Sequence, residues 1–230
     1  MQNTESNNSE KLIEYLSQFV TPNRLALFDD VIRYRTRYLT VVLEDIYQSQ
    51  NASAVVRTCD CLGIQDIHII ENKNSYTINP DVALGSTKWV NLNRFNDTGN
   101  NTLKAINVLR NKGYRIVATS SHTKDNELHN FDLTKGKVAL LFGTEQDGLS
   151  ETALGNIDES LKINMYGFTE SFNISVSAAI ILHHLSEQLR KSDLDWRLTK
   201  KENVEIKLRW LKNTVKHSEL LEKDFFRKYL

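Results

Sequence analysis

The sequence has few prolines and glycines, which interrupt helices and strands, and few cysteines, which cross-link a chain. Its 230 residues include two prolines and nine glycines, which excludes collagen-like and linker-rich proteins. Two cysteines, Cys59 and Cys61, are too few for a disulfide framework and lack zinc-finger spacing, so we expect reduced, buried or half-buried, non-catalytic thiols. No apolar run approaches the ~20 residues of a membrane span. The polar first ten residues predict no signal peptide, and we expect a soluble, cytoplasmic protein.

Several nucleotide and metal motifs are also missing. The sequence contains no G-x-G-x-x-G, no G-x-S-x-G and no H-E-x-x-H. Gly143 and Gly148 have the spacing of a P-loop, but Leu149 stands where the phosphate-binding lysine is required. His183 and His184 are adjacent, so on a helix they point about 100° apart and cannot share a metal. These absences argue against the usual dinucleotide and triphosphate sites, and we expect no metal.

Charge is balanced in total but not along the chain. The sequence has 29 basic and 29 acidic residues, with a net charge of −4 over residues 39–185 and +4 over residues 186–230. Four arginines lie close together before the acidic part, namely Arg24, Arg33, Arg35 and Arg37. Such clusters most often form solvated helix faces. The alternative is a phosphate-binding rim, because basic side chains near a nucleic acid release counterions and supply affinity.

The middle of the chain alternates between short apolar runs and helical patterns. Strands are predicted at Leu39–Leu43, Ile67–Ile70, Tyr114–Ala118, Val138–Phe142 and Leu161–Ile163. Helices are predicted at Ala52–Leu62, Thr102–Lys112 and Ser175–Leu189. This alternation predicts an α/β fold whose parallel sheet is covered by helices on both faces. We therefore expect a helical extension over residues 1–38, an α/β domain over 39–190 and a second helical extension over 191–230.

Three segments place polar or glycine residues at strand ends. The first is N-A-S-A-V-V-R-T-C-D at 51–60, where Asn51 begins a helix and Arg57 follows in its second turn. The second is L-L-F-G-T-E-Q-D-G-L-S at 140–150, whose glycines let backbone approach a ligand closely. The third is S-F-N-I-S-V-S at 171–177, at the start of a helix. Taken singly, the polar residues of the third segment are explained by ordinary helix capping.

Together and in this order, the three segments resemble the motifs of the SPOUT superfamily of RNA methyltransferases, over about residues 39 to 190. Within that superfamily the chain is similar to the TrmH family, which methylates the 2′-hydroxyl of guanosine 18 in the D-loop of tRNA. The stretch G-S-T-K-W-V at 85–90 agrees as well. Three residues depart from the family pattern: Gln50 replaces a frequent histidine, Asn164 a proline and Phe172 a leucine.

The resemblance implies a fold with a C-terminal trefoil knot, a homodimer, S-adenosylmethionine as methyl donor and tRNA as substrate. It places catalytic residues at Arg57, Asn51, Glu145, Ser171 and Asn173. It implies cofactor-binding residues at Thr119, Leu141, Gly143, Ile163 and Phe172. With a polyanionic substrate implied, Arg24, Arg33, Arg35 and Arg37 become candidate RNA-binding residues, together with the basic tail from about residue 190.

Three alternatives stay open at the level of the sequence. The same chemistry could act on ribosomal RNA or on another tRNA nucleotide. The scaffold could also serve as a non-catalytic RNA-binding dimer. Finally, Arg57 could act as a general base, or as a bidentate phosphate clamp, which agrees better with the persistent positive charge of a guanidinium.

Overall fold

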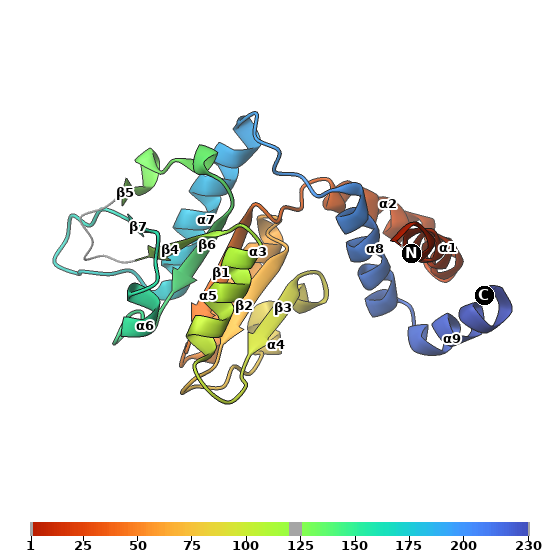
Figure 1. Cartoon of the computed structure of the whole chain (residues 1–230), viewed down its shortest axis with the longest axis horizontal. Helices are drawn as coiled ribbons and strands as arrows, with labels where there is room; N and C mark the ends of the chain where they lie inside the picture. Colours follow the sequence, from red (N-terminus) through yellow and green to blue (C-terminus); the bar gives the residue numbers. More distant parts are fainter. Residues whose placement is uncertain (1, 120–125, 230) are drawn as a thin grey trace. The chain divides into compact units, whose positions relative to one another are not determined.

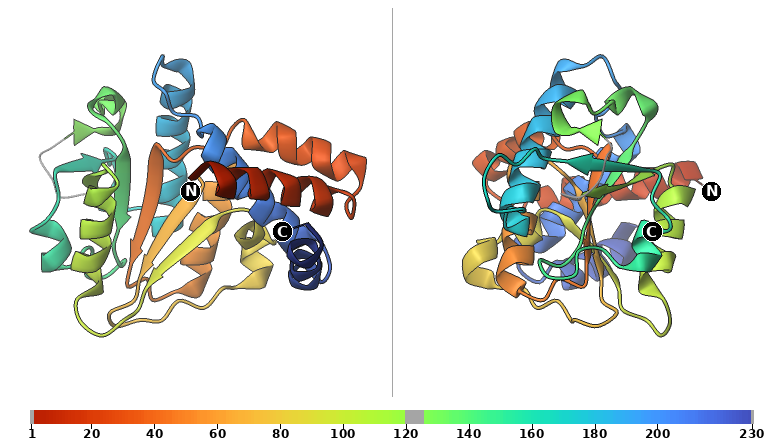
Figure 2. Two further views of the ribbon diagram at one scale, coloured as in Figure 1. Left: turned by 45° about the vertical axis from the view of Figure 1, so that its right-hand side comes forward. Right: turned by 90° about the vertical axis from the view of Figure 1, so that its left-hand side faces the viewer.

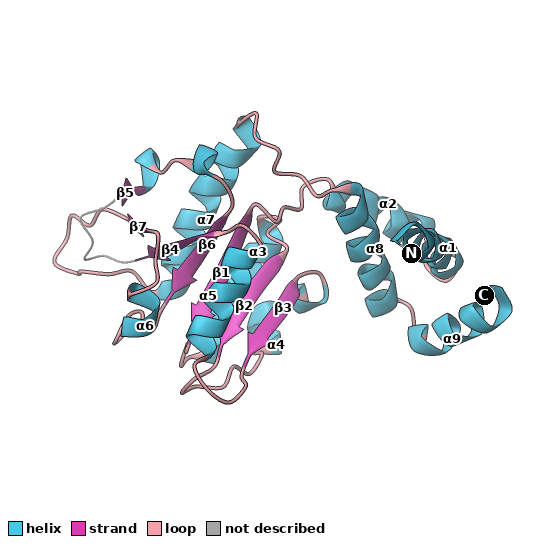
Figure 3. Cartoon of the chain, viewed as in Figure 1, coloured by secondary structure: helices cyan, strands magenta, loops and turns pink. Residues whose placement is uncertain are grey.

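The computed structural model describes residues 2–119 and 126–229, shown as helices, strands and loops in Figures 1 and 3. The chain divides into two compact units. One unit contains the sheet and spans Thr36–Trp196. The other is helical and combines Met1–Arg35 with Arg197–Leu230. In the described ranges, no helix has both the length and the apolar character needed to cross a membrane.

Within the described residues, seven strands form one sheet in the order β3-β2-β1-β6-β4-β7-β5, and all pairs are parallel. The strands are β1 (Leu39–Glu44), β2 (Asp66–Ile70), β3 (Asn91–Phe95), β4 (Arg115–Thr119), β5 (Asn126–Glu127), β6 (Val138–Phe142) and β7 (Glu159–Lys162). Strand β6 lies between β1 and β4, with Leu140 opposite Val41 on one side and Val117 on the other. The central strands are thus parallel neighbours whose carboxyl ends share one edge of the sheet.

Helices lie on both faces of the sheet (Figure 2), and each face is buried in its own hydrophobic core. Helices α3 (Ser49–Cys61) and α7 (Ile174–Lys191) contribute to the first core, and α5 (Asn101–Asn111) and α6 (Glu151–Leu154) to the second. Side chains alternate between the faces: Val41 packs in the first core and Val42 in the second. The predicted parallel sheet with helices on both faces is confirmed.

Apolar runs in the sequence predict the central strands of the sheet correctly but miss the two edge strands. The five predicted strands and three predicted helices form within a few residues of the predicted bounds. Strands β3 and β5 were not predicted, because N-L-N-R-F is mostly polar and β5 has only two residues. The remaining short elements are α4 (Pro80–Ala83), η1 (Ser86–Lys88), η2 (Leu128–Asn130) and η3 (Leu133–Lys135).

Both cysteines are free thiols on α3. Cys59 is buried, as expected. Cys61 is exposed, so the expectation that both are at least half-buried is wrong for this residue. Two positions correspond to about 200° around a helix, which turns Cys61 away from the sheet.

The second unit contains the helices predicted at both ends of the chain. They are α1 (Gln2–Ser17), α2 (Pro22–Ile32), α8 (Lys200–Thr214) and α9 (Ser218–Tyr229). Helix α2 begins at the Thr21 cap followed by Pro22, and α8 begins with a capping box. Aromatic contacts join the two ends of the chain, since Phe28 packs on Trp210. This unit is therefore built from segments far apart in the sequence.

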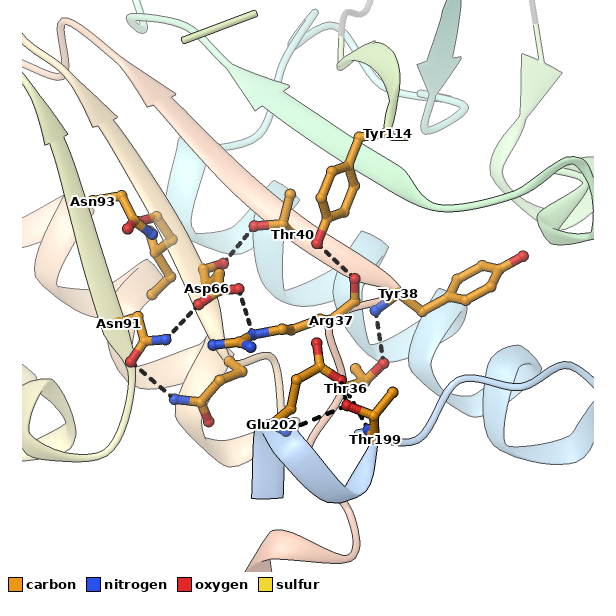
Figure 4. A network of polar contacts seen from close by, with 12 residues as sticks. Thr36, Arg37, Tyr38, Thr40, Asp66, Asn91, Asn93, Tyr114, Thr199 and Glu202 are labelled. Atoms are coloured by element: carbon orange, nitrogen blue, oxygen red, sulfur yellow. Dashed lines mark hydrogen bonds and ion pairs between the residues drawn. The ribbon is translucent and has the colours of Figure 1, made fainter. Parts of the chain in front are cut away.

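A polar network fixes the beginning of β1 against β2 and β3 (Figure 4). The Nε of Arg37 lies 2.9 Å from Oδ2 of Asp66, and Asn91 donates to the other carboxylate oxygen over 2.6 Å. Thr40 donates from Oγ1 to the main-chain oxygen of Asp66 over 2.6 Å. The side chains of Arg37 and Asp66 are only 16% and 14% exposed. Arg37 is thus part of the internal structure of the sheet unit.

Candidate functional site

A cavity of about 460 Å³ opens at the carboxyl ends of β4, β6 and β7. Thr119 ends β4 and Phe142 ends β6, and α7 closes the cavity from the other side with Ile174, Ser177 and others. In open parallel sheets, ligands bind in this position, outside the carboxyl ends of the strands. The volume falls in the roughly 300–1,000 Å³ range of small-molecule sites. The cavity is therefore the candidate binding site.

The loop that follows β6 forms one wall of this cavity and is tightly folded. The main chains of Thr144 and Gly148 exchange hydrogen bonds of 2.9 and 3.1 Å, which closes the loop on itself. Gly148 has φ +68°, a left-handed conformation that favours glycine. A Cβ on Gly143 would overlap the backbone of Gly148. The loop geometry thus requires both glycines of the segment.

Three of the predicted catalytic residues meet at this loop. Oε1 of Glu145 accepts hydrogen bonds from the Nδ2 atoms of Asn51, over 2.9 Å, and Asn173, over 2.6 Å. Asn173 also donates to Oδ1 of Asn51 over 3.1 Å. Asn51 lies in the first turn of α3 and Asn173 caps α7. Two helix N-termini, each with a partial positive charge, therefore flank one carboxylate.

Two predicted catalytic residues do not join this cluster. Ser171 lines the cavity but is exposed. Arg57 lies six residues after Asn51 on α3, which turns its side chain about 120° away from that of Asn51. Its side chain is exposed and makes no hydrogen bond or ion pair with any residue that the structure describes. The guanidinium is thus available for an anionic group outside this chain.

Four of the five predicted cofactor residues line the cavity, namely Thr119, Gly143, Ile163 and Phe172. Leu141 does not: its side chain packs in the second core, and its carbonyl accepts a hydrogen bond of 2.7 Å from Oγ1 of Thr119. Leu141 therefore orients Thr119 without facing the cavity. Sequence reasoning missed other lining residues, including Met165 and Ile181, because apolar residues beside a motif carry no signal of their own.

The predicted arginine cluster separates into two kinds of residue. Arg24 and Arg33 are exposed, and within the described part of the chain the Arg33 side chain pairs only with the exposed Asp30, over 3.5 Å. Arg35 is 2% exposed, and its guanidinium carbon lies 5.3 Å from the ring centroid of Trp210. Arg37 is held by Asp66, as described above. The expectation of an RNA contact is corrected for Arg35 and Arg37, because both side chains are committed to internal packing.

Replacing Asn173 with aspartate should make stability depend on pH. The new carboxylate can still cap α7, but it would lie against the carboxylate of Glu145. Two carboxylates at this distance favour a shared proton, so folding of the variant takes up a proton. Stability should therefore fall as pH rises. We expect the loss of unfolding free energy to be roughly 1–2 kcal/mol larger at pH 8 than at pH 5 in urea titrations.

Asn173→Ala is the matched control for that prediction. It removes the cap and one hydrogen bond to Glu145 without adding a charge, so it should destabilise by about 1 kcal/mol at both pH values. An equal loss at pH 5 and pH 8 in the aspartate variant would contradict the close contact between residues 145 and 173.

Residues 38–183 match the SpoU rRNA Methylase family. A tRNA (guanosine(18)-2′-O)-methyltransferase of Borreliella burgdorferi is 47% identical over 212 residues, which cover 92% of this chain and 95% of that protein. The protein of the same name from Thermus thermophilus is 34% identical over 76% of this chain and 87% of its own length.

Solved structures agree with the sequence matches. The match to the crystal structure of the A. aeolicus TrmH/SpoU tRNA modifying enzyme spans 84% of this chain and 98% of the solved chain, with a TM-score of 0.74 and 27% identity. The family match spans most of the sheet unit, including the loop and helices that carry Glu145, Asn51 and Asn173. The chain belongs to the SpoU rRNA Methylase family.

Proposed function

We propose that this protein transfers a methyl group from S-adenosylmethionine to the ribose 2′-hydroxyl of guanosine 18 in the D-loop of tRNA. One observation carries the proposal: the Asn51–Glu145–Asn173 cluster lies beside a ligand-sized cavity. The chain that builds it is 47% identical, over nearly its whole length, to a protein named for this reaction.

The residues around the cavity fit the proposed methyl donor. Its walls combine apolar side chains such as Ile163, Met165 and Phe172 with the main chain of the loop from Gly143 to Ser150, the glycine loop. Such a mixture suits a ligand that joins a flat aromatic base to a polar amino-acid chain. Thr119, Gly143, Ile163 and Phe172 would hold the donor, with Leu141 orienting Thr119 from behind. Bound S-adenosylmethionine supplies a methyl group on a positively charged sulfur.

The chain's own residues have to orient the hydroxyl and assist the loss of its proton. Asn51 and Asn173 hold Oε1 of Glu145 in one orientation at the cavity wall. The proton leaves to Glu145 or to water, and Ser171 provides a further hydroxyl at the wall. Arg57 has no internal partner among the described residues, and a guanidinium stays charged at physiological pH. We assign Arg57 as a bidentate clamp on a substrate phosphate.

Further features implied by the family belong to the same proposal. We propose a C-terminal trefoil knot, a homodimer, a cytoplasmic location, and domain boundaries near residues 38 and 190. Sedimentation equilibrium of the purified chain tests the dimer, and a monomer at micromolar concentration would exclude it.

The test of the function is methylation of unmodified bulk tRNA with labelled S-adenosylmethionine, followed by mapping of the modified nucleotide. We expect label at guanosine 18. Ribosomal RNA fragments serve as the parallel substrate, and label there or at another tRNA nucleotide would assign the chemistry to a different target. Absence of turnover on all substrates, with RNA still bound, would favour the non-catalytic alternative.

Exposed arginines of the helical unit should contribute to tRNA affinity and not to donor binding. Arg24→Gln with Arg33→Gln should lower the slope of log K against log salt by up to roughly 0.9 for each phosphate that is no longer neutralised. The expected change is therefore at most about 1.8, with unchanged affinity for S-adenosylmethionine. Salt titrations of tRNA binding measure it.

The matched control removes two positive charges elsewhere, with Lys104→Gln and Arg110→Gln on α5. This control should give a line parallel to wild type. If the Arg24 and Arg33 variant also gives a line parallel to that of wild type, these arginines face solvent and make no contact with tRNA phosphates. Arg35 and Arg37 are left unchanged in both variants, because removing them would disturb packing.

A further inference from the structure

Glu44 is a buried carboxylate at the end of β1, outside the cavity lining and 2% exposed. Ser150 donates to it twice, from its main-chain nitrogen to Oε2 over 2.9 Å and from its hydroxyl to Oε1 over 2.7 Å. Thr102 of α5 donates to Oε1 over 2.5 Å. Among the described residues it has no cationic partner, so its contacts are hydrogen bonds alone. A buried polar group of this kind strongly constrains its partners, because leaving them unpaired is costly.

The carboxylate joins three segments that are distant in the sequence. Ser150 is the residue at which the glycine loop ends and α6 begins. Thr102 in turn accepts a hydrogen bond of 2.9 Å from Asn72, in the connection after β2. Asn72 also accepts from the main chain of Asn101 over 3.0 Å. The end of the glycine loop is thus linked, through Glu44, to a polar network between β1, the connection after β2 and α5.

The position of Ser150 determines where the loop lies. Strand β6 fixes the loop at its first end, and Glu44 binds its second end through two hydrogen bonds to Ser150. Between these two points the loop contributes Gly143, Glu145 and Gly148 to the cavity wall. Leu149, which is buried and also lines the cavity, directly precedes Ser150. Releasing Ser150 would let the cavity wall move without altering any residue that faces a ligand.

We propose that Glu44 is a positioning residue that sets the glycine loop for donor binding by holding Ser150. This inference rests on the proposed function, because it takes S-adenosylmethionine as the ligand of the cavity. Hydrogen-bond acceptance matters here and the negative charge does not. A glutamine keeps one acceptor oxygen for the Ser150 nitrogen, but its amide then faces the two hydroxyls, which already accept hydrogen bonds from Asn72 and from the main chain of Ala153.

Two pairs of variants separate positioning from general stability. Glu44→Met keeps the side-chain length but leaves Ser150 and Thr102 without their acceptor, whereas Glu44→Gln keeps an acceptor for the Ser150 nitrogen alone. Ser150→Ala and Thr102→Val each remove one hydroxyl from the same oxygen, Oε1, but only Ser150 belongs to the loop. Unfolding temperatures are measured for all four, and binding is measured well below the lowest of them.

The readout is the dissociation constant for S-adenosylmethionine without tRNA, by calorimetry, with kcat and the KM for each substrate. For Glu44→Met we expect a rise in Kd of about tenfold, the size expected when buried hydrogen bonds are removed, and an unchanged KM for tRNA. Ser150→Ala should weaken donor binding in the same direction, and it keeps the test open if the methionine variant does not fold. Thr102→Val should stay within about twofold of wild type, and Glu44→Gln, which keeps one acceptor, should lie between wild type and Glu44→Met.

The possible failures are distinguishable. If wild type neither binds the donor nor methylates RNA, the proposed function is wrong. If wild type binds S-adenosylmethionine and the folded Glu44→Met variant binds it equally well, the positioning role is overturned. Where Glu44→Met does not fold, equal binding by Ser150→Ala overturns it. Equal weakening by Thr102→Val and Ser150→Ala would also overturn it, because the effect would then follow network stability and not the loop.

Discussion

Replacing Gly143 with alanine should reduce affinity for S-adenosylmethionine at least about 100-fold while most of the fold remains. Overpacking costs ~1–3 kcal/mol when neighbouring side chains can shift, and here the added Cβ would overlap the Gly148 backbone, which cannot. The loop must then open, which breaks the hydrogen bonds between Thr144 and Gly148. Calorimetric titration with the donor measures the affinity, and circular dichroism reports the fold.

Gly167→Ala is the control for that substitution. Gly167 follows β7 in the connection to α7, and a Cβ there would come no closer than 4.0 Å to a neighbouring atom. This variant should bind the donor within a few-fold of wild type. Tight binding by the Gly143 variant would mean that the loop does not form the cavity wall in solution.

Removing Arg57 should have the opposite profile, with donor binding preserved and methyl transfer abolished. Arg57→Ala should lower kcat/KM by about 100-fold or more, the range seen when one group that stabilises developing charge is deleted. Stability should barely change, because the side chain is exposed and makes no hydrogen bond or ion pair in the described part of the chain. Single-turnover methylation of tRNA and donor titrations provide the two measurements.

Arg57→Lys distinguishes the roles open to this residue. Lysine keeps the charge but lacks the planar fork that binds a phosphate through two parallel hydrogen bonds. A clamp should therefore lose most of its effect, mainly as a higher KM for tRNA. A general base would instead become easier to deprotonate as lysine, and activity would rise with pH. Full activity of the alanine variant would remove Arg57 from the site altogether.

The sequence predicted those parts of the fold that depend on local pattern. Central strands such as β6 are apolar on both faces, so a short run of V-A-L-L-F is enough to locate them. One face of the edge strand β3 is half-buried or exposed, and the strand carries asparagine and arginine. It therefore lacks the apolar run by which a strand is located in the sequence. Parallel pairing also explains why the polar residues after separate strands meet at one edge, although Asn51 and Asn173 are far apart in the chain.

Burial of charged residues depends on distant partners and could not be predicted in this way. Arg33 and Arg35 look equivalent in the sequence, yet only Arg35 is covered, because Trp210 packs over its guanidinium. Glu44 gave no signal either, as its partners Thr102 and Ser150 come from other connections of the sheet unit. The family resemblance named several residues that line the cavity, such as Thr119 and Gly143, but not the network behind it.

The helical unit also constrains how the protein is made. Helices α1 and α2 leave the ribosome about 160 residues before α8 and α9. At a synthesis rate of ~5–20 residues per second, the delay is roughly 10–30 s. Throughout that interval Tyr15 and Phe28 lack their aromatic partners Phe225 and Trp210. The nascent chain therefore exposes the apolar faces of α1 and α2 until translation is nearly finished. A chain stalled before α8 would be a ready target for chaperones and proteases.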